Sequence, residues 1–390
     1  MDIHHISNFF EPAWEAGGVA NAASQIAKQQ SYLGHYVKST TTSGFLNEDF
    51  SKQDNQSQVN AQYLPTISDR LTEEFLFPMP YKGFSKLRSD ISQADIVHIH
   101  EHRSPLAAIS SIIANREDVP TILQPHGSLG YDRGRRRAKV VFDHAIGNWI
   151  LQNSSRYIAT SEPELRELTG FGVREQKVDI IPIGINEDEV PTDLSGRNFK
   201  LKYQIPTNKK LILFLGRLDG IKGLPLLLQA ISMIMEVESS DCHLAIVGPE
   251  NDHQKKLKNM AEELEITKHV TFPGPVYGDE KYDAYDAADL YVLPSHFESF
   301  STTVLEAGIV GTPVLVSENC WISSLLDEFD EGFTFKRTQR ELASHINELL
   351  YNENKRRSFS TNFKQRIKDV FTWEKIAINT IESYEEIISG

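Results

Sequence analysis

The sequence predicts an α/β protein made of two domains, each with a doubly wound parallel sheet. Short apolar runs alternate with stretches of helical apolar spacing along most of the chain, which is the pattern of successive βαβ units. Glycines and polar residues follow many of these runs, at the positions where sheets of this kind bind ligands. A chain of 390 residues is long for one hydrophobic core and suits two domains of ordinary size.

The composition is that of a globular protein and argues against several functional classes. Charged residues make up 24% of the chain and hydrophobic residues 40%, and the formal net charge of −14 argues against general nucleic-acid binding. Two cysteines, Cys242 and Cys320, provide neither a disulfide framework nor the spacing of metal ligands, which suits a reducing compartment. The first residues lack the pattern of a signal peptide, and no apolar run has the length of a membrane span. We therefore expect a cytoplasmic protein.

The N-terminal segment predicts a strand, a glycine loop and a helix. The strand is expected over residues 3–10, and the helix over residues 19–33, where apolar residues recur at helical spacing before Gly34. In the loop, Gly17 and Gly18 would allow the backbone to approach an anion at the start of the helix. A plain tight turn is an equal alternative, because the G-x-G-x-x-G fingerprint of dinucleotide-binding proteins is absent.

Histidines alternate with apolar residues in the strand predicted over residues 94–100. His98 and His100 lie in this strand and His102 follows at the same spacing, so a metal site has to be considered. No carboxylate or cysteine pattern accompanies the three histidines. We therefore expect no metal here, and we predict that backbone groups form hydrogen bonds with these rings.

Another histidine, His126, follows the strand predicted at residues 121–123. The sequence Gln124-Pro125-His126-Gly127 leaves that strand directly, which places His126 at the ligand-binding edge of the sheet. This position makes His126 a candidate contact for a ligand. The alternative is a histidine that only caps the following turn.

A strongly cationic segment comes next. Residues 133–139 carry five cations in seven positions, among them Arg133, Arg135, Arg136 and Arg137, in a chain that is acidic overall. Such a segment could bind an anionic acceptor, for example a lipid-linked phosphate or an acidic glycan, or it could touch an anionic membrane surface. The alternative is a solvated helix start whose charges pair with acids elsewhere.

The boundary between the domains is expected after residue 186. A strand predicted at residues 178–183 runs into Gly184-Ile185-Asn186, and residues 187–208 are polar with few helical signals. We therefore predict an N-terminal domain over residues 1–186, a linker over residues 187–208, and a second domain that begins at residue 209.

Two cations follow the first strand of the second domain. This strand is expected over residues 210–215 and ends at Gly216; Arg217 comes next, and Lys222 lies five residues further on, just before a helix. Two positive charges beside a helix N-terminus suit a diphosphate leaving group, because negative charge builds up on that group as the bond to it breaks. A solvated turn is the alternative.

The most informative stretch is residues 298–306. It follows a strand predicted at residues 290–293, and the hydroxyl residues at 301–303 open a helix, where free N–H groups and the helix dipole favour a phosphate. Glu298 precedes this helix and Glu306 lies more than a turn inside it, so each could accept hydrogen bonds from sugar hydroxyls on either side of a phosphate. A simple capping box formed by Thr303 and Glu306 is the alternative.

Together these motifs resemble the retaining glycosyltransferases of family GT4. The resemblance covers almost the whole chain, although Ser301 stands where the family pattern has glycine. It rests on five ordered motifs: the glycine loop, Gln124-Pro125-His126-Gly127, Gly184-Ile185-Asn186, Gly216-Arg217-Leu218 with Lys222-Gly223, and the paired glutamates. The resemblance implies the GT-B fold, with two Rossmann-like domains facing a central cleft. It also implies that the second domain extends over residues 209–370 and that a last helix, residues 371–390, crosses back to the first domain.

The resemblance further implies roles for individual residues. The catalytic residues would be His126, Arg217, Lys222 and Glu298. The donor would be bound by residues from loops of both domains: Gly17, Gly18, Gly216, Arg217, Lys222, Gly248, Val276, Ser301, Thr302 and Glu306. The cations Arg133, Arg135, Arg136 and Arg137 would bind the acceptor. Because Arg217 and Lys222 would hold the diphosphate, the reaction would need no metal ion and no cofactor.

The function implied is transfer of a sugar, with retention, from a nucleotide diphosphate donor to a glycan or lipid-linked acceptor. A UDP-sugar is the preferred donor and GDP-mannose the other candidate. The expected setting is surface polysaccharide or glycoconjugate biosynthesis, in the cytoplasm or at the inner face of the membrane. Two alternatives are a nucleotide-sugar 2-epimerase of the GT-B fold, which acts on the donor alone, and a non-catalytic GT-B protein that binds a sugar or a partner.

Overall fold

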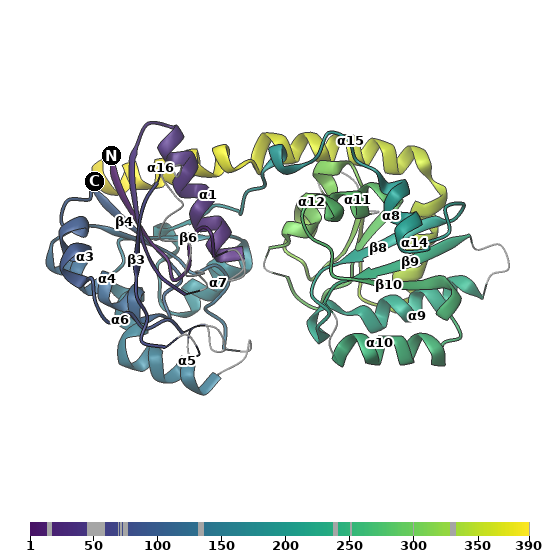
Figure 1. Cartoon of the computed structure of the whole chain (residues 1–390), viewed down its shortest axis with the longest axis horizontal. Coiled ribbons are helices and arrows are strands. Elements are labelled where there is room, and N and C mark those ends of the chain that lie inside the picture. Colours follow the sequence, from purple (N-terminus) through teal and green to yellow (C-terminus); the bar gives the residue numbers. More distant parts are fainter. Residues whose placement is uncertain are drawn as a thin grey trace. The chain divides into compact units, whose positions relative to one another are not determined.

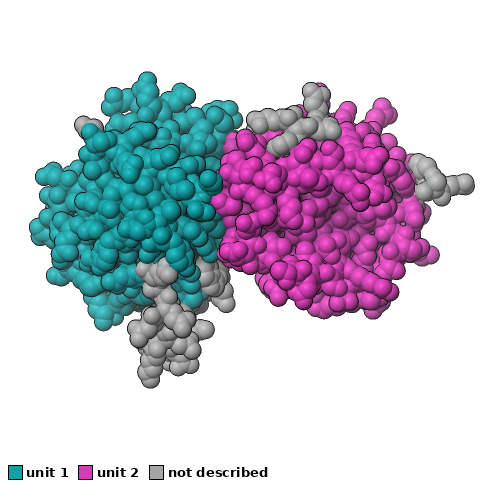
Figure 2. All heavy atoms as spheres, turned by 90° about the horizontal axis from the view of Figure 1, so that it is seen from above, with its two compact units in different colours: residues 1–184, 373–390 teal, residues 185–372 magenta. Residues whose placement is uncertain are grey.

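The computed structural model divides into two units, shown in different colours in Figure 2. Unit 1 consists of residues 1–184 and 373–390, and unit 2 of residues 185–372. The residues that the structure describes are 1–13, 18–44, 59–68, 70, 72, 77–131, 136–236, 241–249, 252–298, 300–327 and 333–389.

In the described part of unit 1, seven strands form one parallel sheet in the order β3-β2-β1-β4-β5-β6-β7 (Figure 1). The strands are β1 (Asp2–Ile6), β2 (Tyr36–Thr42), β3 (Asn60–Leu64), β4 (Ile96–His100), β5 (Thr121–Gln124), β6 (Arg156–Ala159) and β7 (Val178–Ile180). The order reverses between β1 and β4, and in doubly wound sheets ligands bind beyond the carboxyl ends of strands at such a point.

Helices cover both faces of the unit 1 sheet, because successive side chains of a buried parallel strand point to opposite faces. In β4, Val97 and Ile99 face one apolar core, whereas Ile96 faces the other. The first core is covered by α3 (Phe84–Ile91), α4 (Pro105–Arg116), α6 (Asn148–Asn153) and α7 (Glu162–Gly170). The second is covered by α1 (Gly18–Tyr32) and by α16 (Trp373–Ser389), the last helix of the chain, which packs against α1.

In the described part of unit 2, six strands form a second parallel sheet in the order β10-β9-β8-β11-β12-β13. They are β8 (Lys210–Leu215), β9 (Cys242–Val247), β10 (Val270–Gly274), β11 (Leu290–Leu293), β12 (Val314–Ser317) and β13 (Thr334–Phe335). The helices are α8 (Gly196–Lys202), α9 (Leu224–Met235), α10 (Asp252–Glu263), α11 (Asp279–Ala287), α12 (Thr302–Val310), α13 (Ser323–Asp327), α14 (Gln339–Tyr351) and α15 (Glu353–Val370). The two parallel sheets confirm the predicted fold class.

The segment predicted as a linker, residues 187–208, is an ordered part of unit 2, so that prediction was wrong. It contains α8, whose Phe199 is buried in the unit 2 core. The backbone N–H of Ser195 donates to Asp283 Oδ1 at 2.7 Å, and that of Gly196 donates to Asp286 Oδ2 at 2.8 Å. Both aspartates lie on α11, so they satisfy the free N–H groups at the start of α8 and tie the segment to the unit.

No helix in the described ranges is both long enough and apolar enough to cross a membrane.

Candidate active site

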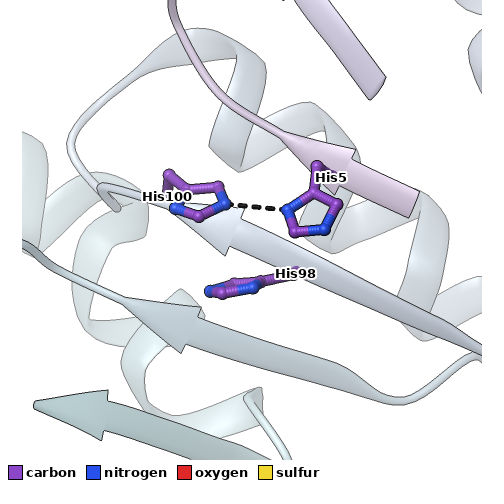
Figure 3. Close-up of side chains that lie close together, drawn as sticks. All are labelled: His5, His98 and His100. Carbon is purple, nitrogen blue, oxygen red and sulfur yellow. Dashed lines mark hydrogen bonds between the residues drawn. The ribbon is translucent and has the colours of Figure 1, made fainter. Parts of the chain in front are cut away.

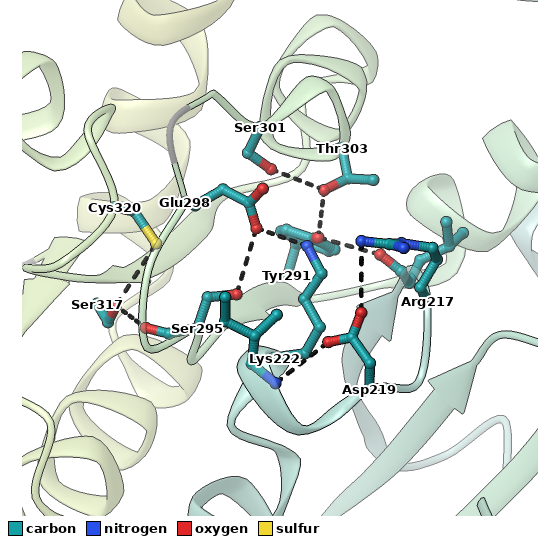
Figure 4. Close-up of polar contacts among 12 residues, drawn as sticks. Arg217, Asp219, Lys222, Tyr291, Ser295, Glu298, Ser301, Thr303, Ser317 and Cys320 are labelled. Atoms are coloured by element: carbon teal, nitrogen blue, oxygen red, sulfur yellow. Dashed lines mark hydrogen bonds and ion pairs between the residues drawn. The ribbon is translucent and has the colours of Figure 1, made fainter. Parts of the chain in front are cut away.

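Lys222 and Glu298 form an ion pair in unit 2. Lys222 ends a short 3-10 turn, η6 (Gly220–Lys222), which follows β8, and Glu298 lies between β11 and α12. The Lys222 Nζ is 2.5 Å from Glu298 Oε2, and only 14% and 19% of the two side chains are exposed (Figure 4). The Ser295 hydroxyl lies 3.5 Å from the same carboxylate oxygen. The fold thus brings together the residues expected at the diphosphate and at the sugar of a donor.

Arg217, the other predicted cation, lies on the same loop but is exposed. Its guanidinium is 3.4 Å from Asp219 Oδ2, and 80% of its side chain is accessible to solvent. Asp219 also accepts a hydrogen bond from the backbone N–H of Ile221 at 3.2 Å and so caps the turn that carries Lys222 (Figure 4). Asp219 therefore holds one cation directly and positions the other through the backbone.

The start of α12 carries the predicted hydroxyl residues. Ser301 is the N-cap residue, and its Oγ lies 2.9 Å from Thr303 Oγ1, which also accepts a hydrogen bond from the Tyr291 hydroxyl at 2.7 Å. The Ser301 side chain forms no capping hydrogen bond to this helix, so the first-turn N–H groups have no cap from it. The capping-box alternative is wrong, because Thr303 lies inside the helix and Glu306 binds other residues.

Glu306 lies one turn further along α12, in a second polar cluster. Its Oε1 is 2.9 Å from Lys281 Nζ, and its Oε2 accepts a hydrogen bond from the Tyr285 hydroxyl at 2.9 Å. Burial raises the pKa of Tyr291 far above its ordinary value, and the charges of Glu298 and Glu306 raise it further. The rings of Tyr291 and Tyr285 have centroids 5.7 Å apart, which places the two polar clusters near each other.

The predicted glycines allow close contacts between these loops. A Cβ on Gly248 would lie 2.2 Å from the carbonyl oxygen of Gly216, so the loops after β8 and β9 approach each other this closely only because Gly248 has no side chain. Val276, expected at the base of the donor, is buried in the unit 2 core, whereas the neighbouring Tyr277 exposes 76% of its surface. Thr302 is exposed at the start of α12.

Replacing Gly223 with alanine is expected to disturb the Lys222 turn. Gly223 has a left-handed backbone (φ 68°, ψ 21°), and a Cβ there would lie 2.1 Å from Pro294 O. Gly311 provides a matched control: its backbone is also left-handed (φ 103°, ψ 15°), but an added Cβ would meet no described atom within 4 Å apart from those of the chain beside it. We expect G311A to lose about 1 kcal/mol of unfolding free energy and G223A at least ~2 kcal/mol more. Urea denaturation measures both, and equal losses would contradict the clash.

In unit 1, His126 follows β5 at the carboxyl edge of the sheet. Its backbone is left-handed (φ 54°), which is uncommon for a residue other than glycine. The turn is held by the buried carboxylate of Glu164, which accepts the backbone N–H of Gly127 and, at 2.7 Å each, the backbone N–H and hydroxyl of Thr160. His126 therefore does not cap the turn with its side chain. Its Nε2 lies instead 2.9 Å from His100 Nδ1.

Figure 3 shows His5, His98 and His100 side by side on β1 and β4. Their nearest nitrogens lie within 4.8 Å of one another, but His5 Nδ1 and His100 Nε2 are already joined by a hydrogen bond of 2.9 Å. His98 Nδ1 is bonded to the Tyr384 hydroxyl at 2.6 Å. The expectation that backbone groups bind His98 and His100 was wrong, because their hydrogen-bond partners are side chains from β1, from the turn after β5 and from α16. His102 is not part of this group and lies 3.5 Å from Asp143.

Two family models match this chain. The model for Glycosyltransferase Family 4 matches residues 16–189, and the model for Glycosyl transferases group 1 matches residues 197–366, so the two matches lie in units 1 and 2 and together span most of the chain. The chain belongs to glycosyltransferase family GT4.

Individual proteins resemble this glycosyltransferase over its whole length or over part of it. An uncharacterised glycosyltransferase of Methanocaldococcus jannaschii is 26% identical over 376 residues, which are 95% of this chain and 94% of that protein. The D-inositol 3-phosphate glycosyltransferase of Corynebacterium urealyticum is 26% identical over 248 residues, 61% of this chain and 58% of that one. Anabaena HepE, solved in complex with UDP, has a TM-score of 0.74 at 18% identity. The match covers 99% of this chain and 100% of the HepE chain. The enzyme therefore has the GT-B fold.

The structure of this glycosyltransferase describes only some of the glycines and cations that the sequence predicted for the site. Gly17, Arg133 and Arg135 lie outside the described residues, and Gly18 is the first residue of α1. Arg136 and Arg137 are exposed on α5 (Arg136–Phe142).

The sequence analysis missed the residues that anchor the chain on either side of the cationic segment. The carboxylate of Asp143 binds Arg103 Nε at 2.9 Å and Nη2 at 2.6 Å, and accepts the Tyr131 hydroxyl at 2.7 Å. Burial alone would raise the pKa of Asp143, but the nearby His102 and hydrogen bonds from Arg103 and Tyr131 hold it well below its ordinary value. Asp143 opens the π-helical turn η3 (Asp143–Gly147), and no spacing in the sequence links it to Arg103.

A second omission is Glu101, which directly follows β4. It has a left-handed backbone (φ 62°), and burial raises the pKa of its carboxyl group to about 7, against the lowering effect of a hydrogen bond from Asn8. A carboxyl group that titrates near neutral pH can either donate or accept a hydrogen bond, so Glu101 is a candidate contact for a substrate hydroxyl. Its place immediately beyond a buried strand was the signal that could have identified it.

Proposed function

We propose that this glycosyltransferase moves a sugar from a UDP-sugar to a hydroxyl of an anionic acceptor, with retention at the anomeric carbon. The observation that carries the proposal is the contact of Lys222 with Glu298. A cation suits the diphosphate and a carboxylate suits the sugar hydroxyls, and in a nucleotide sugar these two groups are directly bonded.

The choice of UDP rests on a solved structure that resembles this chain. HepE has been solved with UDP, UDP-glucose, and UDP together with glucose. In this chain, Glu306 accepts hydrogen bonds from Lys281 and Tyr285, and we assign the ribose of the nucleotide to this carboxylate. GDP-mannose is the second candidate donor, because a ribose is common to both nucleotides.

The exposed Arg136 and Arg137 support an anionic acceptor. Their guanidinium groups suit phosphate or carboxylate, and the name of the related enzyme of Corynebacterium urealyticum contains a phosphorylated compound, D-inositol 3-phosphate. We therefore propose a phosphorylated glycan or a lipid-linked phosphate as the acceptor class.

The mechanism that we propose uses no protein nucleophile. The acceptor oxygen attacks the anomeric carbon on the face from which the nucleotide departs, the bond between that carbon and the β-phosphate oxygen breaks, and that oxygen takes up the acceptor proton. Lys222, Arg217 and the N-terminus of α12 would stabilise the charge on the diphosphate, so the reaction would need no metal ion. His126 would hold a hydroxyl of the transferred sugar or of the acceptor.

A thermal-shift panel of UDP, GDP and ADP, with and without EDTA, tests the donor assignment. A ligand at about 100 times its Kd adds about 2.7 kcal/mol to the stability of the state that binds it. We expect a clear rise in melting temperature with UDP that EDTA leaves unchanged and that E306Q reduces. A shift with GDP alone would replace UDP by GDP, and a shift abolished by EDTA would contradict the metal-free site. Interconversion of a nucleotide sugar without acceptor would indicate a 2-epimerase instead.

A further inference from the structure

A continuous line of hydrogen bonds runs through unit 1 and ends at His126. His126 Nε2 lies 2.9 Å from His100 Nδ1, and His100 Nε2 lies 2.9 Å from His5 Nδ1. His5 Nε2 lies 2.8 Å from Gln30 Oε1. The line thus passes from the carboxyl edge of the sheet, across β4 and β1, to helix α1.

This line is shielded from solvent. The relative exposure of His5, His100 and Gln30 is at most 1%, and they lie on the sheet face that α1 and α16 cover. The rings of His5 and His100 are nearly parallel, at 17°, with centroids 5.3 Å apart, and a hydrogen bond joins their facing nitrogens (Figure 3). No water is needed to connect one ring to the next.

All three rings are neutral near pH 7. Burial lowers the pKa of His5 to about 4 and that of His126 to about 3. Burial also lowers the pKa of His100 well below its ordinary value, and the neighbouring histidines lower it further. A neutral imidazole has one N–H and one lone pair, so each ring must donate from one nitrogen and accept at the other.

The carboxamide of Gln30 therefore sets the direction of every bond in the line. Its Oε1 can only accept, so His5 carries its proton on Nε2 and accepts at Nδ1. His100 must then donate from Nε2 and accept at Nδ1, and His126 must donate from Nε2. The remaining nitrogen of His126, Nδ1, is left with a lone pair, and it has no partner among the described residues.

The other end of Gln30 is fixed by the last helix of the chain. Gln30 Nε2 donates to the Tyr384 hydroxyl at 3.2 Å, and that hydroxyl lies 2.6 Å from His98 Nδ1. Burial lowers the pKa of His98 well below its ordinary value, whereas a contact from the side chain of Gln124 favours a proton on this ring. Both ends of the Gln30 carboxamide are thus hydrogen-bonded, Oε1 to His5 and Nε2 to Tyr384.

We propose that Gln30, His5 and His100 are positioning residues that hold His126 in its Nε2–H tautomer and so present the Nδ1 lone pair of His126 as an acceptor for a substrate hydroxyl. The inference deepens the proposed function, since the role of the lone pair rests on a sugar or acceptor hydroxyl reaching His126. The assignment of the tautomer rests on the hydrogen bonds between rings that are neutral.

The proposal has a chemical consequence at the site. An Nδ1 lone pair accepts a hydroxyl proton, whereas the opposite tautomer would present an N–H and would select an acceptor atom such as a carbonyl or phosphate oxygen. Turning the Gln30 carboxamide over would reverse every bond in the line and convert one site into the other. The selectivity of His126 is therefore set by a residue that lies three hydrogen bonds away.

The test is the tautomer of each ring in the full-length protein with ¹⁵N in its histidines, recorded without substrate by two-bond ¹H–¹⁵N correlation near pH 7. His→Gln substitutions at positions 5, 100 and 126 assign the peaks. We expect the Nε2–H pattern for all three rings in the wild type. In Q30M, which removes the terminal acceptor, we expect loss of the single Nε2–H pattern at His126 and appearance of the Nδ1–H form.

H4Q is the matched control, because His4 is buried on β1 but bonds Thr40 at 2.9 Å, outside the line. Its substitution should leave the His126 pattern unchanged. An Nδ1–H pattern at His126 in the wild type would overturn the proposal, even if Q30M failed to fold. An unchanged pattern at His126 in folded Q30M would also overturn it. Because these spectra need no donor, failure of the UDP assignment would leave their outcome intact.

Discussion

Replacing Lys222 with alanine is expected to lower kcat by roughly ten- to a thousandfold, the range seen when one charge-stabilising donor is removed. Lys222 is mostly buried and lies 2.5 Å from Glu298, so its charge acts where water screens poorly. Negative charge grows on the diphosphate during the reaction and not before it, so the loss should fall on kcat more than on donor affinity. We expect a loss within the same range for R217A. The rate of UDP release measures kcat for both variants. The donor in this assay is the nucleotide sugar that raises the stability of the protein.

The control is a second lysine–glutamate pair on the surface of unit 2. Lys202 contacts Glu280, but 59% of the Lys202 side chain is exposed, and neither residue belongs to the site. K202A should keep kcat within about twofold of the wild type, since exposed pairs contribute little. Comparison of K222A with the double variant K222A/E298Q separates the loss of the cation from the effect of leaving the Glu298 carboxylate unpaired. Wild-type turnover in both K222A and R217A would contradict the assigned diphosphate site.

Unit 1 is expected to lose stability steeply as the pH falls below about 6. Burial lowers the pKa of His4 and His5 to about 4 and that of His126 to about 3. Burial lowers the pKa of His102 as well, and it takes those of His98 and His100 well below the ordinary value. In unit 2, burial lowers the pKa of His243 to about 4. The larger effect is therefore expected in unit 1.

The sign follows from proton binding. In the unfolded chain a histidine takes up its proton near pH 6.5, whereas these folded rings stay neutral down to about pH 4, so acid favours the unfolded state. The stability that these neutral rings contribute to unit 1 is fully present above about pH 7 and is lost between about pH 6.5 and pH 4. At about pH 5.5 each such ring lowers the free energy of unfolding by about 1 kcal/mol. Several rings together approach the whole unfolding free energy of a typical domain, about 5–15 kcal/mol.

Hydrogen exchange of the backbone amides follows the stability of the two units separately. It is measured at about pH 7 and about pH 5.5, with the two data sets compared at matched chemical exchange rates. We expect strands β1, β4 and β5 to lose protection before β8 and β11. H4Q should reduce the pH dependence of the stability of unit 1 by about one proton taken up on unfolding. H253Q, at an exposed position of unit 2, should leave this pH dependence unchanged. Equal loss of protection in both sheets would contradict the assignment to the buried histidines.

Local patterns in the sequence sufficed for the elements and for much of the site in unit 2. Lys222 and Glu298 are 76 positions apart, yet each follows a buried strand, and β8 and β11 are neighbours in the sheet. Residues beyond the carboxyl ends of adjacent parallel strands meet at one edge, so the two motifs converge. The partner of Glu306 could not be predicted in this way. Lys281 lies in the middle of α11, where nothing in the spacing distinguishes it from an exposed lysine.

The linker prediction shows the limit of composition as a guide. Residues 187–208 are polar, but their backbone N–H groups are bound by aspartates of α11 and Phe199 is buried. A polar segment is indistinguishable from a linker until the partners of its polar groups are known.

By itself, the sequence of this protein determined the two parallel sheets, the loops at their carboxyl edges and the place of His126, because strand and helix periodicity and turn residues act over a few neighbouring positions. The tertiary structure alone decided which groups those residues meet. Gln30 and Tyr384 are 354 positions apart and come into contact only because α16 packs on α1. The proposed direction of the hydrogen bonds from Gln30 to His126 depends on which end of the Gln30 carboxamide faces the His5 ring, since the two ends differ and only the tertiary structure brings them to their partners.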